Sequence, residues 1–86
     1  MYTVRWLTLA ADELHVAWQS GDATRHAALE WAINDLDYRL TRYPLDEGES
    51  RPGGYRVTFS WPLAILFAVN EERQLVRIHH AWTYRR

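Results

Sequence analysis

One long amphipathic repeat constrains the fold of this chain more than any other feature. Between residues 29 and 43, apolar side chains recur at spacings of four and three, at Leu29, Ile33, Leu36, Leu40 and Tyr43. This spacing predicts a helix of about five turns with a single apolar stripe. Asp22 is suited to cap its start, and Pro44 ends it because the residue before a proline avoids the helical region. Such a stripe must be buried against a second layer.

A strand and a shorter helix are expected before the long helix. Residues 2–7 alternate between apolar and polar side chains, which is the period of a strand. Thr8 offers an N-cap, and Ala11, Leu14 and Trp18 follow at helical spacing. Gly21 suits the left-handed cap at the end of this helix. Because the link to the next helix is short, the two helices are expected to form an antiparallel hairpin.

Three further strands are expected after the long helix. Residues 44–54 are rich in proline, glycine and acids and predict a loop. Residues 55–60 and 74–82 alternate, whereas residues 62–69 are apolar on both faces, which is typical of a central strand. The short connections between these strands predict an antiparallel meander.

The element order is therefore β-α-α-β-β-β, and the sequence predicts one α+β domain over residues 1–86. We expect two layers, with the helical hairpin on one face of a four-stranded sheet. The other face would stay partly open. If the apolar side chains of each strand face the helices, this open face carries Arg56, Thr58, Arg77 and His79 by alternation. His80, next to His79, is then expected in the core.

Charge is distributed unevenly along the chain. Residues 1–50 hold four arginines against nine acids, a net charge of −5. Residues 51–86 hold six arginines against two acids, a net charge of +4, and there is no lysine. The C-terminal half is therefore expected to bind an anionic partner. A GC-rich genome that favours arginine codons would explain the arginine bias equally well.

The composition also indicates the setting in which the chain works. It has no cysteine, so neither a disulfide framework nor a thiolate metal site is available. The four histidines do not form a metal-binding pattern, and we expect no metal and no cofactor. No apolar run is long enough to span a membrane, and the N-terminus lacks the features of a signal peptide. We expect a soluble cytoplasmic protein with no membrane partner.

Several short segments follow one another in a specific order. They are Val4-Arg5-Trp6 with Ala10, Ala11 and Leu14, the helix that ends near Pro44, Gly48-Glu49-Ser50-Arg51, Gly54-Tyr55-Arg56-Val57, the strand of residues 63–69, and Tyr84-Arg85-Arg86. In this order and spacing they resemble the RelE/ParE superfamily of toxins from bacterial type II toxin–antitoxin systems. The resemblance covers nearly all of the 86 residues.

The resemblance implies a fold, a partner and a target. The fold is an antiparallel four-stranded sheet in the order 1-4-3-2, with the helical hairpin packed on one face. The partner is a small antitoxin that blocks the working surface of the toxin and prevents growth inhibition. RelE-like members are mRNA interferases, endoribonucleases that cut mRNA on the ribosome. ParE-like members inhibit DNA gyrase without catalysis.

RNA cleavage would require three chemical tasks. A 2′-hydroxyl must lose its proton, the charge on the phosphate must be stabilised, and the leaving oxygen must be protonated. The resemblance implies that Arg56 and Arg85 bind the phosphate, while Tyr84 or Glu49 transfers protons. The chain departs from the nuclease pattern at two places. Thr58 occupies one position where the nucleases have a basic residue, and residues 62–64 contain no basic residue where a second is expected.

Four further residues are candidates for contact with nucleic acid, namely Arg51, Arg77, His79 and Arg86. Guanidinium groups bind phosphate through two parallel hydrogen bonds and remain charged. Each candidate also has a structural alternative, such as pairing of Arg51 with Glu47 or Glu49. Three hypotheses for function therefore remain open: an mRNA endonuclease toxin, a gyrase inhibitor, and an inactive family member that only binds protein.

Overall fold

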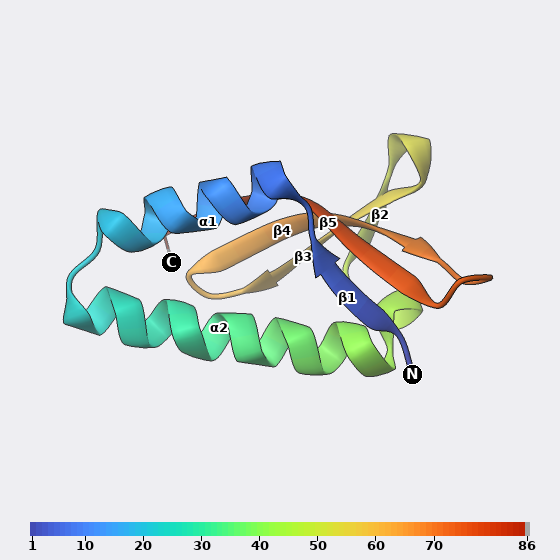
Figure 1. Ribbon diagram of the computed structural model, residues 1–86, viewed down its shortest axis with the longest axis horizontal. Coiled ribbons are helices and arrows are strands. Elements are labelled where there is room, and N and C mark those ends of the chain that lie inside the picture. Colours follow the sequence, from blue (N-terminus) through green and yellow to red (C-terminus); the bar gives the residue numbers. More distant parts are fainter. Residues whose placement is uncertain (86) are drawn as a thin grey trace.

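The structure is a computed structural model, and it describes residues 1–85. A sheet forms one layer and a pair of helices forms the other (Figure 1). The strands are β1 (Thr3–Trp6), β2 (Glu49–Arg51), β3 (Tyr55–Ser60), β4 (Leu63–Asn70) and β5 (Leu75–Thr83). The helices are α1 (Thr8–Gln19) and α2 (Ala23–Arg42), with short 3-10 turns at Pro44–Asp46 and Pro52–Gly54. The predicted α+β class and the helical hairpin are confirmed.

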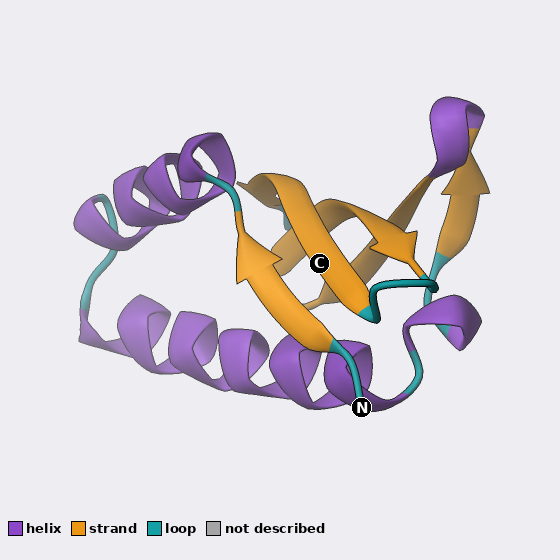
Figure 2. Cartoon of the chain, turned by 45° about the vertical axis from the view of Figure 1, so that its right-hand side comes forward, coloured by secondary structure: helices purple, strands orange, loops and turns teal. Residues whose placement is uncertain are grey.

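The sheet differs from the predicted one in two details. It has five strands, in the order β1-β5-β4-β3-β2. The predicted order is kept, but part of the expected loop at residues 44–54 forms β2, which pairs antiparallel with β3 at the outer edge. In Figure 2 the β2–β3 hairpin projects beyond the helices. Strand β2 has three residues, which are too few to show the alternation by which a strand is recognised in a sequence.

The second difference is the direction of β1, which runs parallel to β5, so the sheet is mixed rather than antiparallel. Tight turns make neighbouring strands antiparallel, but the helical hairpin connects β1 to the rest of the sheet. This hairpin returns the chain to the end of the sheet where β1 starts. There the Tyr2 amide donates to the Thr41 carbonyl at 2.9 Å.

The ends of the helices are set by local contacts. As expected, the Asp22 side chain caps α2, accepting a hydrogen bond of 2.9 Å from the Arg25 amide. The N-cap of α1 is Leu7 rather than Thr8, and it makes no side-chain cap bond. The Leu7 amide donates to the Ile78 carbonyl at 3.0 Å, which extends the contact between β1 and β5 to the start of the helix.

The core lies between the helices and the sheet. Leu29, Leu36 and Leu40 of the predicted stripe are buried, whereas Tyr43 is 62% exposed beyond the end of α2. Strands β4 and β5 supply the opposite wall, and the cluster comprises Ala10, Leu29, Ala32, Leu36, Leu40, Leu63, Ile65, Phe67, Val76, Ile78 and Ala81. Within residues 1–85, no helix is long and apolar enough to cross a membrane.

Candidate functional site: the open face of the sheet

The register of β3 against β4 decides which side chains lie on each face of the sheet. Arg56 pairs with Phe67 and Thr58 pairs with Ile65, and both of these partners are core residues that face the helices. Directly paired residues share a face, so Arg56 and Thr58 lie on the helix side. The expectation that they belong to the open face is wrong. The apolar side chains of β3, Tyr55, Val57 and Phe59, occupy the open face instead.

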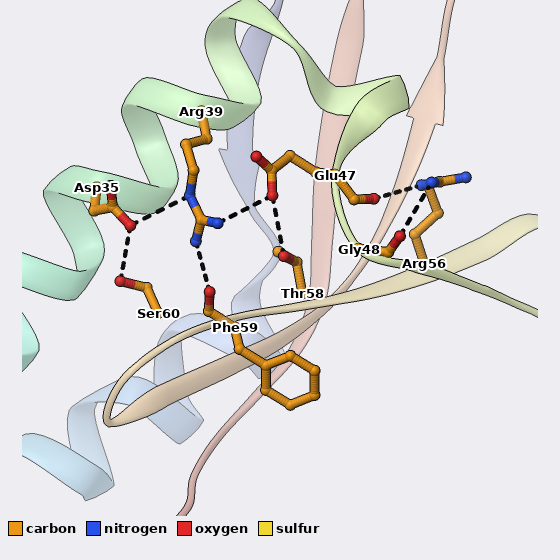
Figure 3. Close-up of polar contacts among 8 residues, drawn as sticks. All are labelled: Asp35, Arg39, Glu47, Gly48, Arg56, Thr58, Phe59 and Ser60. Carbon is orange, nitrogen blue, oxygen red and sulfur yellow. Dashed lines mark hydrogen bonds and ion pairs between the residues drawn. The ribbon is translucent and has the colours of Figure 1, made fainter.

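A polar network makes this reversed orientation of β3 possible (Figure 3). Arg39 of α2 forms ion pairs with Asp35 at 3.2 Å and with Glu47 at 3.1 Å, and it donates to the Phe59 carbonyl at 2.6 Å. Glu47 also accepts a hydrogen bond from the hydroxyl of Thr58, at 3.1 Å. The polar side chains of β3 are therefore hydrogen-bonded although they face the helices.

Ser60 extends the same network, because its hydroxyl donates to Asp35 at 2.9 Å. Thr58 is 4% exposed and Ser60 is 7% exposed. At these depths an unpaired hydroxyl would cost folding free energy, so the two bonds are needed for β3 to hold this orientation. The sequence gives no sign of these bonds, because their acceptors are far away along the chain.

Arg56 is held by its own hairpin (Figure 3). Its Nε donates to the Glu47 carbonyl at 2.8 Å. Its Nη1 donates to the Ser50 hydroxyl at 3.2 Å. A third contact, of 3.5 Å, joins Nη2 to the Gly48 carbonyl. These bonds tie the bend before β2 to β3. Arg56 therefore stabilises the β2–β3 hairpin, and its guanidinium does not lie on the open face.

Glu49 and Arg51 lie on the exposed β2 strand. Their side chains pair with each other, with Arg51 Nη2 3.3 Å from Glu49 Oε2. This is one of the structural alternatives considered for Arg51. Both side chains are solvent-exposed, at 42% and 74%, so the pair is weakly held and can open to a ligand.

The open face carries a basic group at one end. Arg77 of β5 pairs with Arg5 of β1 on one side and with Ala68 of β4 on the other, and Ala68 in turn pairs with Tyr55. The rings of Tyr55 and His79 meet edge to face, with centroids 5.0 Å apart. Arg5, Tyr55, Arg77 and His79 therefore form one surface, called the basic end below. Arg77 and His79 lie on the face predicted for them.

His79 has an unusual protonation equilibrium. Partial burial lowers its pKa below the ordinary value of 6.5, and the neighbouring charges of His80 and Arg77 lower it further. The imidazole is therefore neutral near pH 7 and able to accept a proton. Contrary to the expectation from the sequence, His80 does not lie in the core. A shift of register between Leu66 and Phe67 turns it outward, where its Nδ1 lies 3.2 Å from a Glu13 oxygen of α1.

The other end of the open face is aromatic. The ring of Phe59, which is 47% exposed, meets the ring of Tyr84 with centroids 5.4 Å apart. The Tyr84 amide donates to the Pro62 carbonyl at 3.0 Å, which fixes the start of the tail. Trp82 adds a further ring that is 41% exposed. Tyr55 and Phe59 are four residues apart on β3, so this aromatic end lies about 13 Å from the basic end.

The candidate catalytic residues are thus not gathered into one site. Tyr84 lies at the aromatic end, Glu49 on β2, and Arg56 on the helix side, while Arg85 is exposed next to Tyr84. Arg86 lies outside the described residues. No group of three or more potential metal-binding side chains occurs within residues 1–85.

Sequence reasoning missed Arg5 and Phe59 as parts of this surface. Arg5 does alternate with Val4 and Trp6, and this pattern could have placed it on the open face. Its position beside Arg77 depends on the parallel pairing of β1, for which the sequence holds no local signal. From the sequence, Phe59 is expected on the covered face, because apolar side chains normally point inward.

Comparisons with known proteins agree with this architecture. No family model matches the sequence, and a search of curated proteins gives no significant match. Solved structures do match. The chain is similar to the toxin–antitoxin complex RelBE2 from Mycobacterium tuberculosis, with 26% identity and a TM-score of 0.66, over 96% of this chain and 91% of that chain.

Two other structures match at lower identity. The ParDE toxin–antitoxin system of P. aeruginosa gives a TM-score of 0.75 and 19% identity, covering 99% of this chain and 98% of that chain. The isolated RelE toxin of E. coli gives a TM-score of 0.65 and 13% identity, covering 100% of this chain and 87% of that chain. The chain therefore has the fold of the RelE/ParE toxins, and the resemblance found in its sequence is confirmed.

Proposed function

We propose that this chain is the toxin component of a type II toxin–antitoxin system and that it acts through the open face of its sheet. The single observation that carries this proposal is the basic end, where Arg5, Arg77 and His79 lie on a face that the helices leave uncovered. The likeness to toxin–antitoxin complexes supports a small antitoxin as the partner that masks this face.

The activity that we favour is cleavage of mRNA on the ribosome, with the roles assigned to the basic end. Neutral His79 accepts the proton of a 2′-hydroxyl, whose oxygen attacks the neighbouring phosphorus. The bond to the 5′-oxygen of the next nucleotide breaks, and that oxygen takes a proton from water. The proton held by His79 neutralises the remaining hydroxide, and the products are a 2′,3′-cyclic phosphate and a 5′-hydroxyl. Arg77 stabilises the phosphate charge. This assignment replaces Arg56, which is hydrogen-bonded within the β2–β3 hairpin on the helix side. It also replaces Glu49, which lies on the edge strand β2, three strands away from Arg77 on β5.

Tyr84 and Arg85 receive a different role in this proposal. Because the aromatic end is about 13 Å from the basic end, a side chain there cannot share one proton transfer with His79. Tyr84 and Phe59 instead bind a flanking nucleotide by stacking, while Arg85 contacts its phosphate. Arg51 and Arg86 remain candidates for contact with ribosomal RNA. A cytoplasmic site of action follows from these partners.

Inhibition of DNA gyrase is the second candidate function. Two observations favour it: the catalytic residues implied by the resemblance are dispersed, and the exposed rings of Phe59 and Trp82 suit a protein partner. Primer extension on an mRNA translated in the presence of the protein separates the two functions. Cuts at the ribosomal A site support cleavage. Growth arrest without cuts but with altered plasmid supercoiling would refute cleavage and support gyrase binding.

A further inference from the structure

Two arginines of the open face stand side by side at the junction of β1 and β5. Arg5 and Arg77 are direct partners in the parallel ladder, on strands about 4.8 Å apart. Like charges in directly paired positions oppose folding. An anion bound between the two side chains would remove this repulsion.

The chain itself does not supply such a counter-charge. Within residues 1–85, the ion pairs of arginine side chains belong to Arg39 and Arg51, and neither Arg5 nor Arg77 has an acid within 4.0 Å. Arg39 shows the contrast, since two carboxylates neutralise it on the helix side. The unpaired arginines face a surface that the helices leave open, where an anion has free access.

The surroundings of this pair indicate the kind of anion. Tyr55 and His79 lie on the same face and form an edge-to-face ring pair beside Arg77. Flat rings next to guanidinium groups are the combination that binds single-stranded nucleic acid, because bases stack on the rings while phosphates pair with arginine. An acidic peptide would use the charges but would gain nothing from stacking.

The acids nearby limit the path of such a strand. Arg77 lines an open groove of about 540 Å³ together with Glu71 and Glu72 of the β4–β5 turn. These carboxylates repel phosphate at that end of the groove. An incoming strand is therefore directed away from the turn, across Arg5 and Arg77 toward Tyr55 on β3. Beyond Tyr55, the carboxylate of Glu49 on β2 is paired with Arg51.

We propose that Arg5 and Arg77 form a clamp for one backbone phosphate of a single-stranded RNA, with the adjoining base stacked on the Tyr55–His79 ring pair. The clamp rests on the proposed RNA-cleaving function and adds Arg5 to its binding surface. Arg5 holds the strand on the β1 side, while His79 reacts on the β5 side. The guanidinium pair suits this role because each fork makes two parallel hydrogen bonds to phosphate oxygens.

The test measures RNA binding separately from cleavage. A fluorescently labelled 2′-O-methyl oligoribonucleotide of about 12 residues, which lacks the attacking hydroxyl, is titrated with the purified chain, and its anisotropy is recorded. Arg5→Gln and Arg77→Gln should each raise Kd by about tenfold, as for the loss of a charge-assisted contact. Each should also make the salt dependence shallower, by up to about 0.7 in the slope of log K against log salt, which is the contribution of one phosphate.

Matched variants control for total charge and for misfolding. Arg42→Gln removes the same charge from α2, on the helix side, and should leave Kd within about twofold at moderate salt. Arg5→Gln should unfold at the same urea concentration as the wild type or at a higher one, because it relieves a repulsion. Glu71→Gln with Glu72→Gln should strengthen binding.

Three results would overturn the clamp. One is equal affinity in the wild type, Arg5→Gln and Arg77→Gln; another is an equal loss in Arg42→Gln. The third is displacement of the labelled RNA by a polyglutamate peptide at a carboxylate concentration lower than the phosphate concentration that unlabelled RNA requires. This result would identify an acidic protein segment as the partner. Growth arrest by wild type and Arg5→Gln alike, with unchanged RNA binding, rejects the clamp alone. Tight RNA binding without growth arrest rejects the toxin proposal alone.

Discussion

The network around Arg39 should account for a measurable part of the folding free energy. Replacement Arg39→Met keeps most of the apolar stem and removes the guanidinium. Three contacts are lost: the ion pairs to Asp35 at 3.2 Å and Glu47 at 3.1 Å, and the 2.6 Å bond to the Phe59 carbonyl. The contacts with Glu47 and Phe59 are hydrogen bonds, whereas the Asp35 contact is an ion pair without hydrogen-bond geometry. A charge-assisted hydrogen bond contributes about 1.5–3 kcal/mol when it is well shielded.

Arg39 is incompletely shielded from solvent. The loss of folding free energy in Arg39→Met is therefore expected to be smaller than the sum of the three contact energies. Its side chain is 28% exposed, against 17% for Glu47 and 29% for Asp35. Solvent screening weakens both ion pairs, so we expect a total loss of about 2–3 kcal/mol. For a chain of this size, that corresponds to a fall of about 2 M in the urea midpoint.

The assay is urea unfolding followed by far-ultraviolet circular dichroism at pH 7 and 25 °C. Arg73→Met, in the exposed turn before β5, serves as the matched control and should cost under about 0.5 kcal/mol. Glu47→Gln alone, and Glu47→Gln combined with Arg39→Met, complete a double-mutant cycle with an expected coupling of about 1 kcal/mol. If Arg39→Met costs no more than the control, the network does not hold β3 against α2, and the reasoning fails.

Three further predictions concern other parts of the molecule. Gly48→Ala should destabilise the fold or prevent folding, because Gly48 has φ +69° and a Cβ at this position would overlap the Val57 carbonyl oxygen. Thermal unfolding measures this effect, and an unchanged Tm would refute it. Arg77→Gln should raise the pKa of His79 toward 6.5 in an NMR titration, since a neighbouring cation is removed, and a constant pKa would contradict the assignment. Folding lowers the pKa of His79, so the unfolded chain binds a proton at a higher pH than the folded chain does. The free energy of unfolding should therefore decline as the pH drops below about 6.5. His79→Asn should reduce that decline, measured by urea titrations at pH 7 and pH 5.5.

The sequence allowed the helices and most of the strands to be predicted. The stripe from Leu29 to Leu40 has the period of a helix, and the Asp22 cap and Pro44 mark its ends. These signals are local, since they depend on residues within a few positions of one another. The same holds for β3 and β5, where the alternation extends over at least six residues.

Features that depend on distant partners could not be predicted in the same way. Alternation reveals that β3 has two faces, but not which of them meets the helices. Arg56, Thr58 and Ser60 face inward because Asp35 and Glu47 provide acceptors there. The parallel pairing of β1 likewise depends on the helical hairpin, so the contact between Arg5 and Arg77 emerges only from the structure.

Growth arrest after induced expression tests the central claim most directly. The account predicts that the wild-type chain stops growth of a bacterial host that lacks the antitoxin, and that Arg42→Gln does the same. The double variant Arg77→Gln with His79→Asn, shown to be folded by circular dichroism, should allow growth. Normal growth with the folded wild-type chain, or full arrest by the folded double variant, would contradict the claim that the open face makes this chain a toxin.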